Sequence, residues 1–380
     1  MLARWMKPAT ESRRMRLPDE PHRRRRRSRV WAAVAGVAAA AGLAAPMAVS
    51  ASVTAAQPQE FAYVANSNSN NVSVINTATN TVVTTVDVGD VPSGVAITPN
   101  GAFVYVTNIA SNDVSVINTA TNTVITTVAV GAIPLSVAIT PNGAFAYVTN
   151  LDSDNVSVIN TATNTVIATV PVGDGPDGVA ITPDGALAYV TNSNANNVSV
   201  INTTTNTVVG DPIDVGDDPQ QVAITPNGAF AYVINGSSDN VSVINTTTNT
   251  VIATVDVGAN PRGVAITPDG AFAYVGNRAL NNVSVINTTT NTVVGDPIEV
   301  GAEPQGVAIT SDGSRVYVGN RNSDNVSVID TATNTVITTV AVGVAPLGVA
   351  VGRVEITPTP TPTPTPRRPG ARNNNNNNNG

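Results

Sequence analysis

The chain carries few of the side chains on which most enzymes rely. It has no cysteine, and its only histidine, His22, and only lysine, Lys7, both precede Val30. The rest of the chain therefore lacks the thiolates, imidazoles and primary amines that usually serve as nucleophiles, general bases or soft-metal ligands. We expect a protein that is not an enzyme and that needs no metal or redox cofactor.

The best candidates for binding are residues that vary between otherwise similar segments. A proline recurs before short apolar segments, and the residue after it varies between copies: Ser93, Leu135, Asp177, Gln220, Arg262, Gln305 and Leu347. Arg278 and Arg321 lie in a second set of variable segments. Because binding usually resides in loops on a rigid scaffold, we interpret these nine residues as partner-binding. Drift of unconstrained solvent loops is the alternative.

Charge in these variable segments is uneven. Acidic residues fall in neighbouring segments, and the arginines fall in later ones: Asp152, Asp154, Asp174, Asp177, Asp217 and Asp218 against Arg262, Arg278 and Arg321. Such a polarised rim suits a polar partner, either a protein or a cell-wall glycan. The sequence Asp152-Ser153-Asp154 is only a weak indication of Ca²⁺, because no EF-hand spacing surrounds it. Between Phe61 and Val354 acids greatly outnumber arginines, which disfavours nucleic acid and anionic membranes as partners.

A repeat supplies the elements that would position these residues. All seven tyrosines, from Tyr63 to Tyr317, recur at spacings of 42 or 43 residues in the phrase FAYVTN or a near copy. Each copy also holds GVAIT, NVSVINT and TVVTTVDVG, which are apolar, rich in β-branched residues and separated by turn residues such as Pro99-Asn100-Gly101. Four antiparallel strands in about 42 residues are typical of a propeller blade.

The order of the segments predicts how the ring closes. The repeats open at Phe61 without a GVAIT segment and end with an unpaired GVAVGRV from Gly348. The last segment can therefore complete the first blade and leave no free edge. We predict an all-β, seven-bladed propeller over residues 61–354, with four antiparallel strands per blade, and we expect the ring to be monomeric. Extra residues at Gly210–Ile213 and Gly295–Ile298 are expected in the outer strand.

The phrases YVTN, VSVINTATNTVV and PxGVAITPDG identify a resemblance. They resemble the 40-residue repeat of YVTN-family β-propellers, which are found in surface-layer-like and other exported proteins. The resemblance covers residues 61–354 and implies the propeller fold. It implies little about activity, because related propellers include both scaffolds and lactonases.

The two ends of the chain differ in composition from the repeats. Arg23 to Arg27 precede an Ala-rich apolar run, which is typical of a secretory signal peptide over residues 1–55, followed by a short lead over 56–60. An uncleaved anchor and a nucleic-acid-binding arm are the alternatives for this segment. Five Thr-Pro pairs begin a spacer over residues 355–372, and asparagines dominate residues 373–380. That last run is either a genuine tail or the end of a truncated gene product.

These observations favour an exported, non-catalytic scaffold, secreted or bound at the cell envelope, that presents its variable loops to an envelope protein or glycan. No nucleic acid partner and no membrane insertion of the mature domain are expected. Two alternatives remain open: a lactonase-like hydrolase, and a structural surface-layer or adhesion element.

Overall fold

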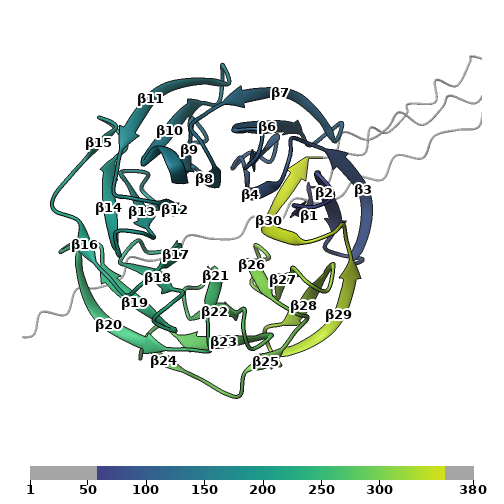
Figure 1. Ribbon diagram of the computed structural model, residues 1–380. Coiled ribbons are helices and arrows are strands. Elements are labelled where there is room, and N and C mark those ends of the chain that lie inside the picture. Colours follow the sequence, from purple (N-terminus) through teal and green to yellow (C-terminus); the bar gives the residue numbers. More distant parts are fainter. Residues whose placement is uncertain (1–57, 356–380) are drawn as a thin grey trace, which may run out of the picture. The chain divides into compact units, whose positions relative to one another are not determined.

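A computed structural model describes residues 58–355 of the chain. These residues form a single ring of seven β-sheets around a central axis (Figure 1). The predicted signal peptide, the polyasparagine tail and all of the Thr-Pro spacer except Glu355 lie outside the described residues. Within the described part, the single helical turn is η1 (Leu151–Ser153), and no helix there is long and apolar enough to cross a membrane.

The two inner positions of each blade are occupied by six-residue strands in all but the first blade. Blade 1 contains β30, β1, β2 and β3, and blades 2 to 7 follow in chain order. The innermost strands, from blade 1 to blade 7, are β30 (Pro346–Glu355), β4 (Pro92–Ile97), β8 (Pro134–Ile139), β12 (Pro176–Ile181), β17 (Pro219–Ile224), β21 (Pro261–Ile266) and β26 (Pro304–Ile309). The second strands are β1 (Pro58–Asn66), β5 (Phe103–Asn108), β9 (Phe145–Asn150), β13 (Leu187–Asn192), β18 (Phe230–Asn235), β22 (Phe272–Asn277) and β27 (Arg315–Asn320).

The third and outer strands complete each blade in the same order. The third strands are β2 (Asn71–Asn76), β6 (Asp113–Asn118), β10 (Asn155–Asn160), β14 (Asn197–Asn202), β19 (Asn240–Asn245), β23 (Asn282–Asn287) and β28 (Asn325–Asp330). The outer strands are β3 (Thr81–Asp87), β7 (Thr123–Ala129), β11 (Thr165–Pro171), β15 (Thr207–Val208) with β16 (Ile213–Asp214), β20 (Thr250–Asp256), β24 (Thr292–Val293) with β25 (Ile298–Glu299), and β29 (Thr335–Ala341). The two extra residues lie between the split outer strands, as the sequence predicts.

The core lies between adjacent blades. The middle strands are buried on both faces, which explains their runs of Val, Ile and Tyr, whereas the outer strands are mostly exposed or half-buried, with a single buried residue such as Val128 of β7. For example, Tyr105 and Val116 of blade 2 pack with Val148 and Ile159 of blade 3 in one apolar cluster. Repetition of this contact around the ring joins each blade to the next.

The ring closes within blade 1, as predicted. Strand β30, at the C-terminal end of the described residues, pairs antiparallel with β1, from Val64↔Val349 to Pro58↔Glu355. Val354 is buried there against Phe61 and Val104. Two segments far apart in the sequence thus share one sheet, and β30 covers the inner edge of β1 (Figure 1).

We predict that removal of β30 destabilises the whole ring. Ending the chain at Ala345 exposes the inner edge of β1 and removes buried Val354. The melting temperature should fall by about 10 °C or more, and the protein should aggregate on heating. Differential scanning calorimetry and light scattering measure both effects. The matched control ends at Ile356 and keeps β30. Equal melting of the two truncated proteins would disprove closure through β30.

Candidate functional site

A cavity at the centre of the ring collects the variable residues that follow the prolines. It has a volume of about 310 Å³. Its lining includes one such residue from each blade: Ser93, Leu135, Asp177, Gln220, Arg262, Gln305 and Leu347. Asp177 and Arg262 are the only charged side chains among the described residues of this lining. We call this cavity the central mouth.

Threonines of the neighbouring blade hold the backbone at the central mouth. Thr149 Oγ1 donates a 2.6 Å hydrogen bond to the Asp177 carbonyl, and Thr191 Oγ1 donates to the Gln220 carbonyl. Thr191 Oγ1 also accepts a 2.8 Å bond from the Gly178 N–H. The lining strands β12 and β17 are therefore fixed by the blade before them as well as by their own sheets. A rigid backbone of this kind fixes where the lining side chains begin.

The carboxyl group of Asp177 has an unusual protonation equilibrium. Burial raises its pKa to about 7, from 3.8 for a solvated aspartate. The positive charge of Arg262 lowers this pKa and the negative charge of Asp218 raises it, but burial dominates. Asp177 lines the central mouth and is half-buried as a residue. A carboxyl that gains and loses a proton near neutral pH is suited to proton transfer.

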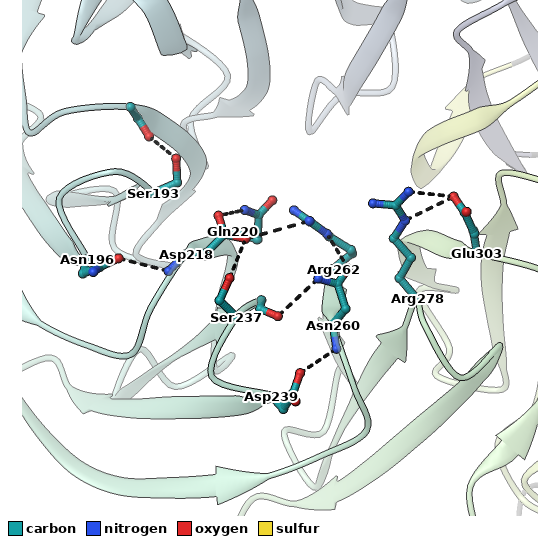
Figure 2. Close-up of polar contacts among 12 residues, drawn as sticks. Ser193, Asn196, Asp218, Gln220, Ser237, Asp239, Asn260, Arg262, Arg278 and Glu303 are labelled. Carbon is teal, nitrogen blue, oxygen red and sulfur yellow. Dashed lines mark hydrogen bonds and ion pairs between the residues drawn. The ribbon is translucent and has the colours of Figure 1, made fainter.

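Arg262 is held by two polar neighbours rather than projecting freely (Figure 2). Its Nε donates to Asn260 Oδ1 at 3.1 Å, and its Nη2 lies 3.8 Å from Asp218 Oδ2. The other carboxylate oxygen of Asp218 accepts a hydrogen bond from Gln220 Nε2. Asp218 therefore orients two lining side chains, one from β17 and one from β21.

Arg278 and Arg321 are also paired, but they lie outside the lining of the central mouth. Arg278 donates to Glu303 Oε2 through Nε at 3.1 Å and through Nη2 at 2.9 Å (Figure 2). Arg321 Nη1 lies 3.3 Å from the same oxygen. These hydrogen bonds and charges hold the pKa of Glu303 below its usual value, although desolvation opposes them. One glutamate therefore compensates only one of the two positive charges in this sector, and binding of a protein or glycan there stays a prediction.

The residue before each proline was not predicted to matter, except for Asp218, which was named only as one of the acids of the polarised rim. This position also varies, and its members are Val91, Ile133, Gly175, Asp218, Asn260, Glu303 and Ala345. Its polar members are the residues that hold the arginines. A comparison of the seven copies at the position directly before the proline would have identified these polar residues. Asp154, considered above for Ca²⁺, accepts the Gly175 N–H at 3.0 Å, and no group of three or more metal-ligating acids or imidazoles occurs among residues 58–355.

Comparison with known proteins assigns a family. A family model described as lactonase, seven-bladed β-propeller, matches residues 57–170 and 248–346, more than half of the chain. The chain belongs to this family. The prediction that this lactonase-family propeller is not an enzyme is therefore wrong. That prediction relied on missing imidazoles and thiols, whereas a buried carboxyl group with a raised pKa can also transfer protons. The finer resemblance to YVTN and surface-layer proteins stays a prediction.

Solved structures share the architecture of this lactonase-family propeller. The hydrazine synthase of Kuenenia stuttgartiensis is 27% identical, with a TM-score of 0.62 over 68% of this chain and 89% of that one. A proposed 6-phosphogluconolactonase of Bacteroides uniformis is 19% identical, with a TM-score of 0.67 over 77% and 99% of the two chains. A second, of Bacteroides fragilis, is 19% identical, with a TM-score of 0.66 over 77% and 98%. No curated protein matches the chain. At 19% identity, the two Bacteroides structures support the fold alone.

We predict that Asp177→Asn stabilises the protein at alkaline pH. A folded-state pKa of about 7 lies above the unfolded value, so the contribution of Asp177 to stability is complete below about pH 4 and is lost as pH rises through 7. Because Asp177 is only half-buried as a residue, we expect a gain of about 1 to 2 kcal/mol at pH 8 and little change at pH 4. Urea unfolding at both pH values measures this difference.

Asp184→Asn is the matched control for this experiment. Hydrogen bonds from the Thr182 hydroxyl and the Ala186 N–H lower the pKa of Asp184. Its carboxylate therefore stabilises the fold above the unfolded pKa, and this contribution is lost as pH falls. The control should show no gain at pH 8. An Asp177→Asn protein whose stability tracks that of the wild type from pH 4 to 8 would refute the raised pKa.

Proposed function

We propose that the chain hydrolyses a small lactone at the central mouth, with Asp177 as the general base. The observation that carries this proposal is the Asp177 carboxyl group, which has a pKa of about 7 and which lines, together with Arg262, a cavity of about 310 Å³. Membership of the lactonase propeller family supports the reaction class. Two solved structures named as proposed 6-phosphogluconolactonases share the fold, which agrees with this choice.

The reaction follows from the two charged groups of the mouth. The ionised Asp177 carboxylate accepts a proton from a water molecule, and the water oxygen attacks the lactone carbonyl carbon. The Arg262 guanidinium stabilises the negative charge that forms on the carbonyl oxygen. The ring C–O bond then breaks, and the proton held by Asp177 passes to the departing alkoxide. The product is a hydroxy acid, which ionises at neutral pH.

The neutral side chains of the mouth define the kind of lactone that fits. Ser93 and Gln305 offer hydrogen-bond donors and acceptors for ring hydroxyl groups. Leu135 and Leu347 offer apolar contact for ring carbons. Gln220 is buried and held by Asp218, so its orientation is fixed before a substrate arrives. A hydroxylated five- or six-membered lactone matches this mixture of groups.

We also propose that this hydrolase works outside the cytoplasm, either secreted or attached to the envelope. Support comes from the sequence, in which Arg23 to Arg27 precede the Ala-rich apolar run. An exported lactonase would act on lactones in the surroundings of the cell. Fractionation of the host with an antibody against the propeller measures the location.

We predict that Asp177→Asn lowers kcat for lactone hydrolysis by about 100-fold, because a general base commonly contributes two orders of magnitude or more. Arg262→Gln should lower kcat by about 100-fold as well, through loss of charge on the oxyanion. In the wild type, kcat/KM should rise with pH through about 7 as Asp177 ionises. A pH-stat assay with glucono-δ-lactone and γ-lactones measures all three.

The control for activity is Asp269→Asn, in a turn at the opposite end of the strands, where Asp269 accepts hydrogen bonds from Thr267 and Ala271. It should retain wild-type kcat. If Asp177→Asn hydrolyses the lactones as fast as this control, Asp177 is not the general base. If the wild type hydrolyses no lactone in the panel, the proposed function is wrong.

A further inference from the structure

One hydrogen bond of the repeat is missing between blades 1 and 2. At each of the six other junctions, a tyrosine hydroxyl donates at 2.6 or 2.7 Å to an asparagine Oδ1 of the next blade. The six pairs are Tyr105 with Asn164, Tyr147 with Asn206, Tyr189 with Asn249, Tyr232 with Asn291, Tyr274 with Asn334, and Tyr317 with Asn80. At the remaining junction the same residue types are present as Tyr63 and Asn122. The hydroxyl of Tyr63 and Oδ1 of Asn122 are both buried, and neither has a hydrogen-bond partner among residues 58–355.

The closure of the ring accounts for this difference. In blades 2 to 6 the inner strand turns into the second strand through a tight loop, whose proline lies beside a glycine of the next blade, as Pro99 lies beside Gly143. Blade 1 has no such loop, because its two inner strands, β30 and β1, come from opposite ends of the described chain. The β30–β1 ladder continues to Pro58↔Glu355, and the Arg353 carbonyl lies against Gly101 instead. The packing between blades 1 and 2 is therefore unlike that of the other junctions.

A cavity lies where the missing hydrogen bond would be. Its volume is about 260 Å³, and Tyr63 and Asn122 both line it. Phe61, Val74 and Val354 supply buried apolar walls. Val83, which also lines it, is 51% exposed and so lies at the opening. We call this space the seam cavity; none of the residues that line it lines the central mouth.

The chemistry of the seam cavity selects one kind of ligand. The buried Tyr63 hydroxyl needs an acceptor, and burial raises its pKa, so it stays protonated at neutral pH. Asn122 Oδ1 needs a donor. A single hydroxyl group on a ligand supplies both, because its oxygen accepts from Tyr63 while its hydrogen is donated to Asn122. Of the other lining residues, Phe61, Val74, Val83, Ala120 and Val354 favour hydrocarbon over water, whereas Gln59, Asn76 and Thr119 add polar groups to the wall.

We propose that the seam cavity binds a small, mainly apolar molecule that carries one hydroxyl group, such as an alkyl-substituted phenol. The volume fits, because an engineered apolar cavity of about 150 Å³ binds benzene and the seam cavity is larger. The ligand restores the inter-blade hydrogen bonding that closure removes. Its hydroxyl is anchored at Tyr63, and its hydrocarbon part packs on Phe61 and Val354.

The test compares 4-ethylphenol with ethylbenzene, which has the same shape without the hydroxyl. Calorimetry on the full chain should show that both bind, with 4-ethylphenol about fivefold tighter because of its hydrogen bonds. Tyr63→Phe should remove this preference and leave ethylbenzene binding unchanged. Tyr189→Phe is the matched control, because Tyr189 already donates to Asn249, and it should leave the fivefold preference intact.

A second pair of variants tests the opening. Val83→Trp should block both ligands, whereas Ile125→Trp, at the equivalent exposed position of blade 2, should block neither. The proposal is overturned if the wild type binds neither ligand, if a soaked crystal shows only water in the cavity, or if Val83→Trp binds like the wild type. Asp177→Asn should bind both ligands normally, so loss of lactone hydrolysis and failure of this proposal are separate results.

Discussion

The geometry of the central mouth depends on one hydrogen bond repeated at every junction. The last residue of each loop between the second and third strands is Asn or Asp, and its side-chain oxygen accepts the N–H of the residue before the next blade's proline. The seven acceptors are Asn70, Asn112, Asp154, Asn196, Asp239, Asn281 and Asp324. These bonds tie each loop to the start of the following inner strand. The mouth residues are therefore placed by the whole ring and not by single loops.

This bond also compensates a strained backbone. Every residue before a mouth proline has a positive φ, including the β-branched Val91 at 56° and Ile133 at 55°. Such residues avoid this region, so the conformation persists only where surrounding contacts enforce it. The captured N–H and the buried proline that follows supply that enforcement. Because the ring imposes the positive φ at the residue before each mouth proline, different side chains occur at this position. The polar residues Asp218, Asn260 and Glu303 are three of them.

The fold could be predicted from the sequence because packing in this protein is periodic. Tyrosine spacing, strand pattern and the unpaired GVAVGRV segment together determine seven blades and their closure. The seven residues after the prolines were grouped correctly in space, because equivalent positions of a ring converge on its axis. The pairing of Arg278 and Arg321 with Glu303 was not readable, since it depends on how far side chains of adjacent blades reach. Nor was the raised pKa of Asp177, which depends on desolvation in the closed ring.

Chemistry in this molecule arises where the repeat is broken. Six of the seven residues after the mouth prolines bear no carboxylate, so Asp177 places its carboxyl group where other blades put an alcohol, an amide, leucine or a guanidinium. The first blade breaks the repeat differently, because its strands come from two ends of the chain and the tyrosine–asparagine bond is lost beside it. At the central mouth, the aspartate at position 177 changes the charge of a cavity that all seven blades line. At blade 1, the closure of the ring changes the packing against blade 2, and the seam cavity lies there. Symmetry alone does not pair every polar group, because Oδ1 of the asparagine that ends the second strand is buried without a described hydrogen-bond partner in six blades. A group that is unpaired or desolvated in one blade alone, as the Tyr63 hydroxyl and the Asp177 carboxyl are, therefore marks a place where the symmetry fails.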